Sequence, residues 1–216
     1  MSTTQKMIIA IDGPAASGKG SLAKKLADYL NFDFLDTGAL YRRVALKVIE
    51  KNIHSDDKTA IIDCAQELSA DLSEKYDDSA LRNDKVGSMA SIVAQLPEVR
   101  QKLIDFQRNF AQKAQKGAVL DGRDIGTVIC PEADIKLFVT ASIEKRTERR
   151  QKELHSRGIN ATPSSVLAEM QERDKRDSVR LNEHLKPDNN AIMIDTSNMT
   201  PSEVFDEALK IIAQKP

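Results

Sequence analysis

The feature that most constrains this chain is a glycine-rich segment, GPAASGKGS at positions 13–21, which lies between an apolar run and a helical pattern. The apolar run, Met7–Asp12 (MIIAID), predicts a buried strand, and apolar residues recur at helical spacing from Gly18 to Leu30. Glycines let the backbone turn its N–H groups inward around an anion, and the helix that follows adds the positive end of its dipole. The segment therefore predicts a phosphate-binding loop between a strand and a helix.

The loop supplies candidate nucleotide-binding residues at every position: Gly13, Pro14, Ala15, Ala16, Ser17, Gly18, Lys19, Gly20 and Ser21. Lys19 can reach the β- and γ-phosphates of ATP as a mobile charge, so it is also a candidate catalytic residue. The usual pattern places Ser or Thr straight after this lysine, where the hydroxyl meets Mg²⁺. Here Gly20 holds that position and the hydroxyl follows at Ser21. We therefore expect Mg²⁺ to be held through water and the phosphates. The alternative is a glycine-rich turn with a chance lysine, which the flanking strand and helix disfavour.

Strand and helix patterns alternate along the rest of the chain. Three further strands are predicted, at Ala118–Asp121, Ile135–Val139 and Ala191–Asp195. Helices are predicted at Ala39–Lys51, Asp56–Ser69, Pro97 to Gly117, Ile143–His155, Ser164–Arg180 and Pro201–Gln214. This alternation implies a parallel sheet covered by helices on both faces. The predicted fold class is therefore α/β, a three-layer P-loop fold.

We expect one domain with two excursions from its core. The core would comprise about residues 1–55, 97–142 and 190–216. A monophosphate-binding insert would occupy about residues 56–96, and a helical, arginine-rich lid about residues 143–182. The sequence has no internal repeat and no low-complexity linker, which favours a single core with insertions.

The composition disfavours several kinds of partner. The 216 residues carry a formal net charge of -1, whereas a general binder of nucleic-acid polymers usually has a basic excess. Tryptophan is absent and aromatic residues make up 4%, which disfavours base recognition by stacked aromatic platforms. No apolar run approaches the roughly 18 residues of a membrane span, and the N-terminus lacks the apolar core of a signal peptide. We therefore expect a cytoplasmic protein that does not associate with membranes.

Two more segments carry polar groups suited to phosphate chemistry. LDTGALYR, at positions 35–42, leads into a predicted helix, and DGRDIGT, at positions 121–127, leaves a predicted strand. In an open parallel sheet, ligands gather beyond the carboxyl ends of the strands. We therefore expect the phosphate-binding loop and DGRDIGT to share one cleft.

Arginines recur at helical spacing in the last third of the chain. Arg146, Arg149 and Arg150 would share one helix face. The next helix repeats the spacing with Arg173, Arg176, Asp177 and Arg180. Charged helix faces are often only solvated and salt-bridged. Phosphoryl transfer spreads charge over equatorial oxygens that arginines neutralise, however, so beside a phosphate loop these helices favour a lid that closes over ATP. Arg146 is then a candidate ATP-binding residue, and Arg149 and Arg150 are candidate catalytic residues.

Five segments, in their order and spacing, resemble the bacterial cytidylate kinases over almost the whole chain: GPAASGKGS, LDTGALYR, SIVAQLPEVR, DGRDIGT and ERDKRDSVR. LDTGALYR together with DGRD is the discriminating pair, because adenylate kinases carry a different motif at the end of the corresponding strand. The resemblance implies a nucleoside-monophosphate kinase that uses ATP and Mg²⁺ to phosphorylate CMP or dCMP.

The resemblance also implies roles by position. Thr37, Tyr41 and Arg42 would line the monophosphate site, and Ser91 and Arg100 would reach the cytosine or the backbone beside it. Asp124 and Asp177 would lie on the ribose side. The acceptor phosphate or the transferring group would be held by Arg42, Arg123, Arg173 and Arg180, of which Arg123 and Arg173 are candidate catalytic residues. Asp36 would position the water shell of the metal, with no direct protein ligand. Asp124 could instead cap a turn, Tyr41 pack in a core, and Arg100 form a surface ion pair.

One segment departs from the family pattern. Members usually have a hairpin with an Asn-Gly turn in the insert, where this chain has only Ser73–Asp84, so we assign no role to Arg82 or Ser88. Rival functions are a kinase for UMP, AMP or shikimate, and a nucleotide-binding switch. A switch needs segments that the γ-phosphate orders, whereas the abundant arginines favour transfer. A purely structural protein is the weakest alternative. We expect a monomer.

Overall fold

The computed structural model describes residues 6–70, 78–81, 83–180 and 190–214. Its elements in chain order are β1 (Met7–Asp12), α1 (Lys19–Leu30), β2 (Asp33–Asp36), α2 (Thr37–Glu50), α3 (Lys58–Ala70), α4 (Asp78–Leu81), α5 (Asp84–Val93), α6 (Pro97–Lys113), β3 (Gly117–Gly122), η1 (Ile125–Ile129), β4 (Ile135–Thr140), α7 (Ile143–Ser156), α8 (Pro163–Arg180), β5 (Ile192–Asp195) and α9 (Pro201–Ala213). The η1 element is a single π-helical turn.

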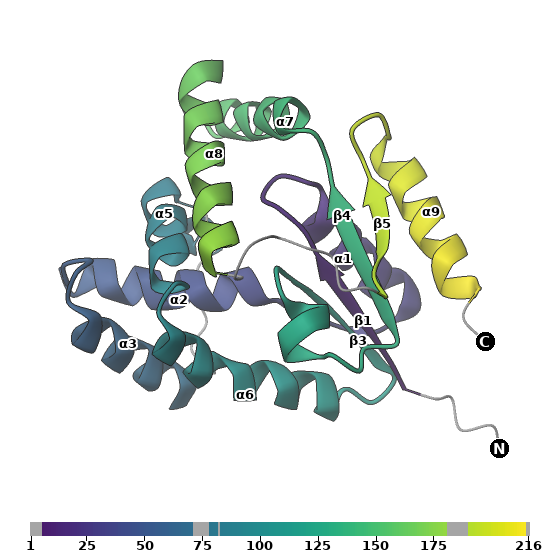
Figure 1. Cartoon of the computed structure of the whole chain (residues 1–216), viewed down its shortest axis with the longest axis horizontal. Coiled ribbons are helices and arrows are strands. Elements are labelled where there is room, and N and C mark those ends of the chain that lie inside the picture. Colours follow the sequence, from purple (N-terminus) through teal and green to yellow (C-terminus); the bar gives the residue numbers. More distant parts are fainter. Residues whose placement is uncertain (1–5, 71–77, 82, 181–189, 215–216) are drawn as a thin grey trace.

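The strands form one parallel sheet in the order β2-β3-β1-β4-β5. The central strand is β1, which pairs with β3 on one side and with β4 on the other. Because all strands run the same way, their carboxyl ends meet at one edge of the sheet, and the glycine-rich loop leaves from the middle of that edge (Figure 1). The predicted α/β fold class is confirmed.

The two faces of the sheet are covered by different helices. Along β1, Ile9 and Ile11 pack against α1 and α9, whereas Ala10 between them packs against α6 and η1. Successive side chains of a strand point to opposite faces, so three neighbouring apolar residues serve two cores. None of the three is exposed to solvent. The resulting arrangement is the predicted three-layer one.

A second apolar cluster lies beside the sheet. It joins α2, α3, α5 and α6 through side chains that include Val44, Ile61, Val93 and Leu103, all fully buried. Figure 1 shows this helical body to the left of the sheet, with α5 close to α8. Its packing brings residues 84–93 towards the carboxyl edge of the sheet, although they are far from the loop in the sequence.

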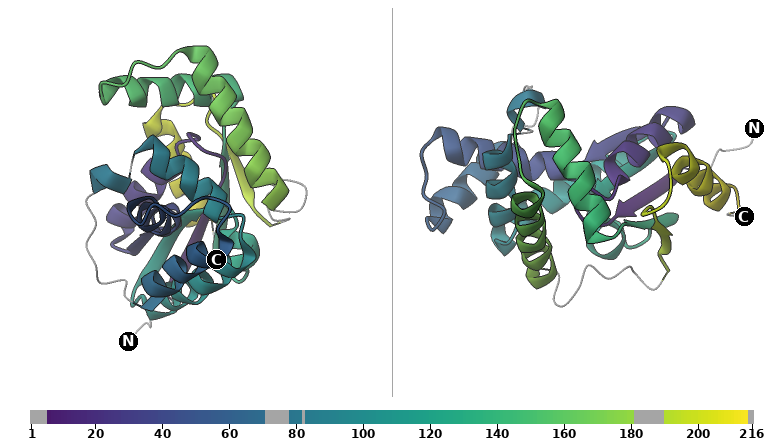
Figure 2. Two further views of the ribbon diagram at one scale, coloured as in Figure 1. Left: turned by 90° about the vertical axis from the view of Figure 1, so that its left-hand side faces the viewer. Right: turned by 90° about the horizontal axis from the view of Figure 1, so that it is seen from above.

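Helices α7 and α8 form a hairpin that stands over the carboxyl edge of the sheet (Figures 1 and 2). The hairpin rests on the glycine-rich loop, because Leu154, Val166 and Met170 form an apolar cluster with Ala15. Full burial of a Leu, Val or Met side chain contributes about 1.5–3 kcal/mol to stability. The hairpin is therefore held against the loop by apolar packing as well as by charge.

Several elements differ from the expectations. All four predicted strands are present, but β2 was not predicted, because it is a four-residue edge strand with an aspartate at each end. Helix α5 and the π-turn η1 were also not predicted. Half of Ser73–Asp84, the segment that departs from the family pattern, lies outside the described residues, namely positions 73–77 and 82.

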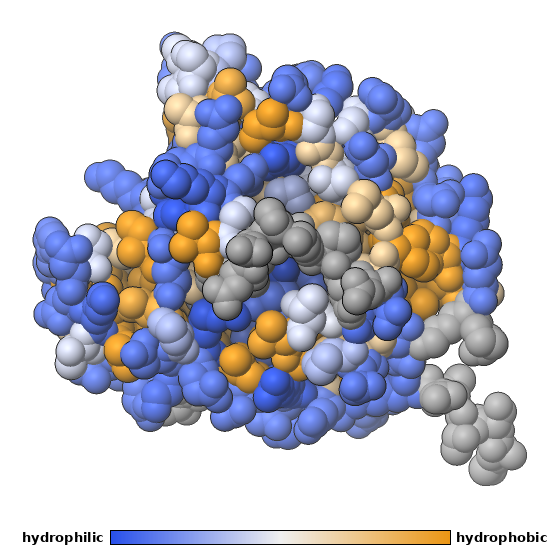
Figure 3. Space-filling view, viewed as in Figure 1, coloured by the Kyte–Doolittle hydropathy of each residue, from blue (hydrophilic) through white to orange (hydrophobic). Residues whose placement is uncertain are grey.

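Polar side chains dominate the face shown in Figure 3, where apolar side chains form small separate groups. Within the described ranges, the exposed large apolar residues are Tyr29, Ile159, Val179, Ile192 and Met193. No helix in the described part of the chain is both long enough and apolar enough to cross a membrane.

Candidate active site

The backbone of the glycine-rich loop takes conformations that ordinary residues avoid. Gly13 has φ 149° and Gly18 has φ 94°, and Ala16 between them has φ 57°. At Gly13 a Cβ atom would lie 2.0 Å from the carbonyl oxygen of Val139, so only glycine fits against β4. No side chain of the described residues caps helix α1 after Gly18. Its first amide groups are therefore available to phosphate oxygens.

Lys19 points from the start of α1 towards the carboxyl end of β3. Its Nζ lies 3.6 Å from Oδ1 of Asp121, and both side chains are buried. Burial, together with the charge of Arg123, lowers the pKa of Lys19 to about 8, although Asp121 opposes the shift. Burial raises the pKa of Asp121. A Cβ at Gly20 would lie 3.0 Å from Oδ2 of Asp121, so a larger residue at this position would require the Asp121 carboxylate to shift.

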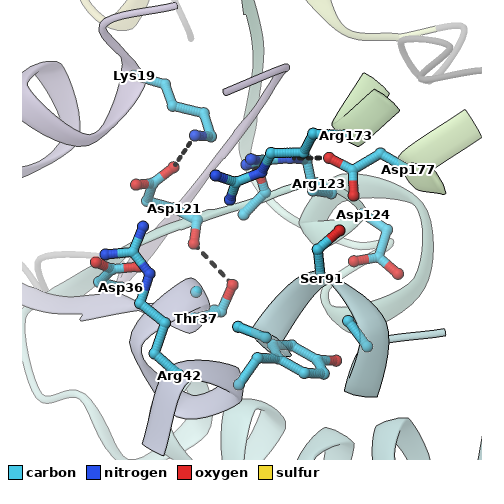
Figure 4. Close-up of a pocket in the computed structure, with 15 residues that line it drawn as sticks. Lys19, Asp36, Thr37, Arg42, Ser91, Asp121, Arg123, Asp124, Arg173 and Asp177 are labelled. Carbon is cyan, nitrogen blue, oxygen red and sulfur yellow. Dashed lines mark hydrogen bonds and ion pairs between the residues drawn. The ribbon is translucent and has the colours of Figure 1, made fainter. Parts of the chain in front are cut away.

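A cavity of about 140 Å³ lies beyond the end of β3, between α2, α5 and α8. Figure 4 shows its charged side chains converging from these elements. It contains most of the predicted acceptor-site residues: Thr37, Tyr41, Arg42, Ser91, Arg123, Asp124, Arg173 and Asp177. Lys19, Asp36 and Asp121 also line it. The fold thus brings together groups that the sequence distributes over 159 positions, from 19 to 177.

Ion pairs fix the orientation of the groups around this cavity. Arg123 Nε lies 2.9 Å from Asp177 Oδ2 on α8, and its Nη1 donates to the carbonyl oxygen of Gly122. Arg100 on α6 forms an ion pair with Asp124. Arg100 is thus placed behind Asp124 rather than in the cavity lining. The predicted contact of Arg100 with the cytosine or the backbone beside it stays a prediction; in the structure its guanidinium pairs with the carboxylate of Asp124.

Arg173 is a cation in the lining of this cavity, and its guanidinium group does not have all of its hydrogen bonds among the described residues. Its Nε is buried and has no hydrogen-bond partner within the described ranges. Burial and the neighbouring charge of Arg123 lower its pKa to about 10. Such a group is stabilised when an anion enters the cavity. Arg180 ends α8, and its side chain lies outside the described residues.

A second cavity, of about 430 Å³, lies between the loop and the hairpin. Its walls include Ala16, Lys19 and Ser21 from the start of the chain, with Arg150 and Glu153 from α7. In this structure Arg150 pairs with Glu153 on its own helix, at 2.9 Å, and with Asp84 on α5. The predicted catalytic arginine thus borders the phosphate loop but is held by two carboxylates.

The other two arginines of α7 hold the hairpin to the loop. Arg146 makes a two-pronged ion pair with Asp174 on α8, at 3.1 and 2.6 Å, and donates to the carbonyl oxygen of Ala15 at 3.4 Å. Arg149 donates to the carbonyl oxygen of Ser17 at 3.2 Å and to the hydroxyl of Thr196 at 2.8 Å. Both guanidinium groups therefore contact loop carbonyls.

A third cavity, more apolar than the other two, continues from the loop along α1 and α9. It also has a volume of about 430 Å³ and is walled by Leu22, Val204 and Phe205, with Arg149 and Thr196 at its rim. It meets the second cavity at Ala16, Ser21 and Glu153. An apolar slot joined to a phosphate loop suits a flat, partly polar ring system.

Three polar residues of the site were missed by the sequence reasoning. Asp121 pairs with Lys19, and Thr196 links the loop, β4 and Arg149. Asp12 accepts hydrogen bonds from the amides of Ile125 and Gly126, both at 2.8 Å, and so holds the DGRDIGT segment against the end of β1. Burial raises the pKa of Asp12 to about 6, although these two bonds oppose the shift. All three lie at or next to the carboxyl end of a strand of the parallel sheet, which is the pattern that could have revealed them.

A P-loop beside a cavity lined by arginines, under a hairpin of arginine-bearing helices, is the arrangement of P-loop kinases. The sequence pattern of the family described as cytidylate kinase matches residues 9–214. The cytidylate kinase of Paramagnetospirillum magneticum is 51% identical over 96% of this chain and 98% of its own. That of Rhodospirillum rubrum is 48% identical over 97% of this chain and 98% of its own. The chain belongs to the cytidylate kinase family, which confirms the resemblance.

Solved structures support the fold at much lower identity. An uncharacterized protein from Eubacterium ventriosum superposes with a TM-score of 0.56 at 18% identity, covering 97% of this chain and 99% of that one. A gluconokinase from Sinorhizobium meliloti 1021 gives a TM-score of 0.51 at 14% identity, covering 96% of this chain and 92% of its own. At these identities the likeness concerns the fold alone.

Proposed function

We propose that the protein transfers the γ-phosphoryl group of ATP to CMP and dCMP, which yields ADP with CDP or dCDP. One observation carries the proposal, and it concerns the cavity beyond the end of β3 (the acceptor cavity) and the cavity between the loop and the hairpin (the loop cavity). The two share a common wall of Lys19, Asp36, Arg42, Arg123 and Arg173. Four of these five residues are cations. A transferring phosphoryl group between two nucleotides needs positive charge at this junction.

On the donor side, the triphosphate of ATP would lie in the loop, with Lys19 at the β- and γ-phosphates. The adenine would enter the apolar cavity between Leu22 and Phe205. Arg149, at the rim of that cavity, contacts both the loop and Thr196. In this arrangement Arg146 and Arg149 act by fixing the loop under the hairpin.

On the acceptor side, Arg42, Arg123 and Arg173 would hold the monophosphate, and the undescribed side chain of Arg180 would join them. Asp124 and Asp177 would accept hydrogen bonds from the ribose hydroxyls, since ionised carboxylates are strong acceptors. Ser91 would face the base. Thr37 donates to the carbonyl oxygen of Asp121 at 2.8 Å and so fixes the start of α2 beside the phosphate.

Magnesium is implied by the use of ATP, and the residues present fit it. Oδ1 of Asp121 is buried with no hydrogen-bond partner among the described residues, and Asp36 lines the same wall. Within those residues no cluster of three or more His, Cys, Asp or Glu could hold a metal directly. Asp36 and Asp121 would thus contact the water shell of a Mg²⁺ bound to the phosphates. The ion would neutralise phosphate charge when bound.

Little covalent chemistry is required of the chain. The acceptor phosphate is already anionic, so the transfer depends on alignment and charge neutralisation rather than on a strong base. Residues 143–182 would close as a lid, and residues 56–96 would form the acceptor insert. Arg150 would exchange Glu153 and Asp84 for the transferring group. Residues of one chain line each of the three cavities described above, and we propose that the protein acts as a monomer. We also propose that it acts in the cytoplasm.

A coupled assay of ADP release tests the proposal. Purified protein is given ATP and Mg²⁺ with CMP, dCMP, UMP, AMP or shikimate, one acceptor at a time. We expect rapid ADP release with CMP and dCMP and at least tenfold slower release with the others, a difference of about 1.4 kcal/mol. A preference for UMP would contradict the proposed acceptor. Equal release without any acceptor would instead favour a nucleotide-hydrolysing switch.

A further inference from the structure

Asp12, the last residue of β1, is a buried acid that the proposed function does not use. In the register of the sheet it lies between Gly122 of β3 and Phe138 of β4. Its two carboxylate oxygens each accept one backbone hydrogen bond, from the amides of Ile125 and Gly126, at 2.8 Å. These are the first two residues of η1, the π-helical turn that follows the DGRD segment. Asp12 therefore caps a turn that begins 113 positions further along the chain.

The residue expected to make this cap is Asp124. The first amides of a helix have no partner within the helix, and an aspartate just before it usually accepts a hydrogen bond from one of them. Asp124 directly precedes η1, yet its side chain makes no capping hydrogen bond to the described residues. Its carboxylate instead pairs with Arg100 and lines the acceptor cavity (Figure 4). Because Asp12 satisfies the amides of η1, the carboxylate of Asp124 is available to the cavity.

Stability alone does not explain an aspartate at position 12. Burial raises the pKa of Asp12 to about 6; the two amide hydrogen bonds oppose this shift, and the charges of Asp124 and Asp121 add to it. When folding raises the pKa of a carboxyl group, the ionised form of that group lowers stability at neutral pH. The position of the carboxylate is therefore better explained by what its two hydrogen bonds hold in place.

We infer that Asp12 is a positioning residue for the acceptor, because it caps η1 in place of Asp124 and so keeps the Asp124 carboxylate in the acceptor cavity. The inference rests on the proposed function, in which Asp124 contacts the acceptor, and deepens it. Without the Asp12 cap, Asp124 would accept from the amides of η1 itself, as aspartates before a helix do, and would turn away from Arg100 and the cavity.

The test compares Asp12→Asn with wild type. Asparagine keeps the shape of aspartate but has one acceptor oxygen, and its NH₂ group would face an amide donor. One amide of η1 then lacks a partner, and Asp124 can turn to accept from it. With ATP saturating, we expect KM for CMP to rise about tenfold, the effect of losing one hydrogen bond to a charged group. KM for ATP and Tm should stay near the wild-type values, since the variant loses a buried charge together with a hydrogen bond.

The matched control is Asp134→Asn. Asp134 accepts a hydrogen bond from the amide of Ile8 at 2.7 Å, near the opposite end of β1. Its replacement removes a comparable contact far from the acceptor cavity and should change neither KM. If Asp12→Asn lowers Tm and leaves KM for CMP unchanged, Asp12 only holds η1 in place, and the inference is overturned.

A double-mutant cycle tests whether Asp12 acts through Asp124. Asp124→Asn alone should raise KM for CMP, and adding Asp12→Asn should raise it little further, whereas additive effects would contradict the inference. If Asp12→Asn does not fold, a crystal structure of the wild-type protein with CMP decides the case. Asp12 should keep both amide hydrogen bonds while Asp124 contacts the nucleotide, and a structure in which Asp124 caps η1 overturns the inference. Wild-type protein that is inactive with CMP would refute the proposed function itself, which separates the two failures.

Discussion

Lys19 and Asp121 form a buried ion pair, with 3.6 Å between Nζ and Oδ1. The pair joins the phosphate-binding loop to the end of β3, and it leaves Oδ1 of Asp121 without a hydrogen bond from any described residue. Lys19 is therefore held near the phosphates by a partner that it can exchange. The arrangement makes the charge of this lysine sensitive to what occupies the loop.

ATP binding should consequently depend on pH. Burial and Arg123 lower the pKa of Lys19 to about 8 in the free protein, and a bound triphosphate favours the charged lysine and raises that pKa. Below pH 8 the lysine already carries its proton, so affinity is full. As pH rises through 8, binding must also take up a proton, and affinity should fall by up to about tenfold per pH unit.

Calorimetry from pH 7.5 to 9.5, in two buffers of different ionisation heat, measures this proton uptake. Lys19→Arg is the control, because arginine keeps its charge throughout the range. It should bind ATP without proton uptake at any of these pH values. Equal affinity at pH 7.5 and 9.5 in the wild type would contradict the prediction.

Replacement of Gly13 and of Gly87 by alanine should change the stability of the protein in opposite directions. At Gly13, with φ 149°, a Cβ would lie 2.0 Å from the carbonyl oxygen of Val139, so Gly13→Ala should destabilise the protein by about 1–3 kcal/mol or more. Gly87 in α5 has no atom within 4 Å of the added carbon. Gly87→Ala should therefore stabilise the protein by about 0.5–1 kcal/mol, through helix propensity. Urea unfolding measures both, and equal effects would refute the argument.

Removal of the Arg173 charge should raise the stability of the protein and lower its activity. The Nε of Arg173 is buried, and desolvation together with the neighbouring charge of Arg123 lowers the pKa of Arg173 to about 10, so folding disfavours the charged form. Arg173→Met should raise the free energy of unfolding by about 1 kcal/mol, or 2–4 °C in Tm, and lower kcat/KM for CMP at least a hundredfold. Thermal melts and kinetics check both effects. Lys175→Met is the control and should change neither, whereas a lower Tm in Arg173→Met would show that its charge is well compensated.

Loss of the Thr196 hydroxyl should raise KM for ATP without changing KM for CMP. Its hydroxyl lies 2.8 Å from Arg149 Nη1 and 2.9 Å from the carbonyl oxygen of Ser17, so it connects the lid arginine to the loop. Thr196→Val should raise KM for ATP about fivefold, the cost of about 1 kcal/mol for one hydrogen bond, and leave KM for CMP unchanged. Thr59→Val, at an exposed position of α3, is the control. A matching rise in KM for CMP would show that Thr196 supports the whole site.

The sequence predicted those parts of the fold that rest on local patterns. The strand before Gly13 and the helix after Gly18 follow from an apolar run, glycines and helical spacing, and the structure confirms both. Strand β2 was missed because Asp33–Asp36 is short, charged at both ends and stabilised by its pairing with β3. That pairing is a long-range contact, which no local pattern reports.

The site shows the same limit. Motifs indicated most of the residues that now share the acceptor cavity, including Arg123 and Asp177. They could not show that these two pair with each other across 54 positions, or that Arg100 binds Asp124. Which carboxylate holds which arginine depends on the packing of α6 and α8. The roles of these residues with bound nucleotides stay predictions.

Helix α8 lines both cavities with one continuous backbone. Met170 lines the cavity between the loop and the hairpin, Asp177 lines the acceptor cavity, and Arg173 lines both. A helix moves nearly as a rigid body. A movement of α8 that improves its contacts with one substrate would therefore also move the residues that contact the other. Synergy follows: whichever nucleotide arrives first should strengthen the attachment of the second, and by the same factor in either order.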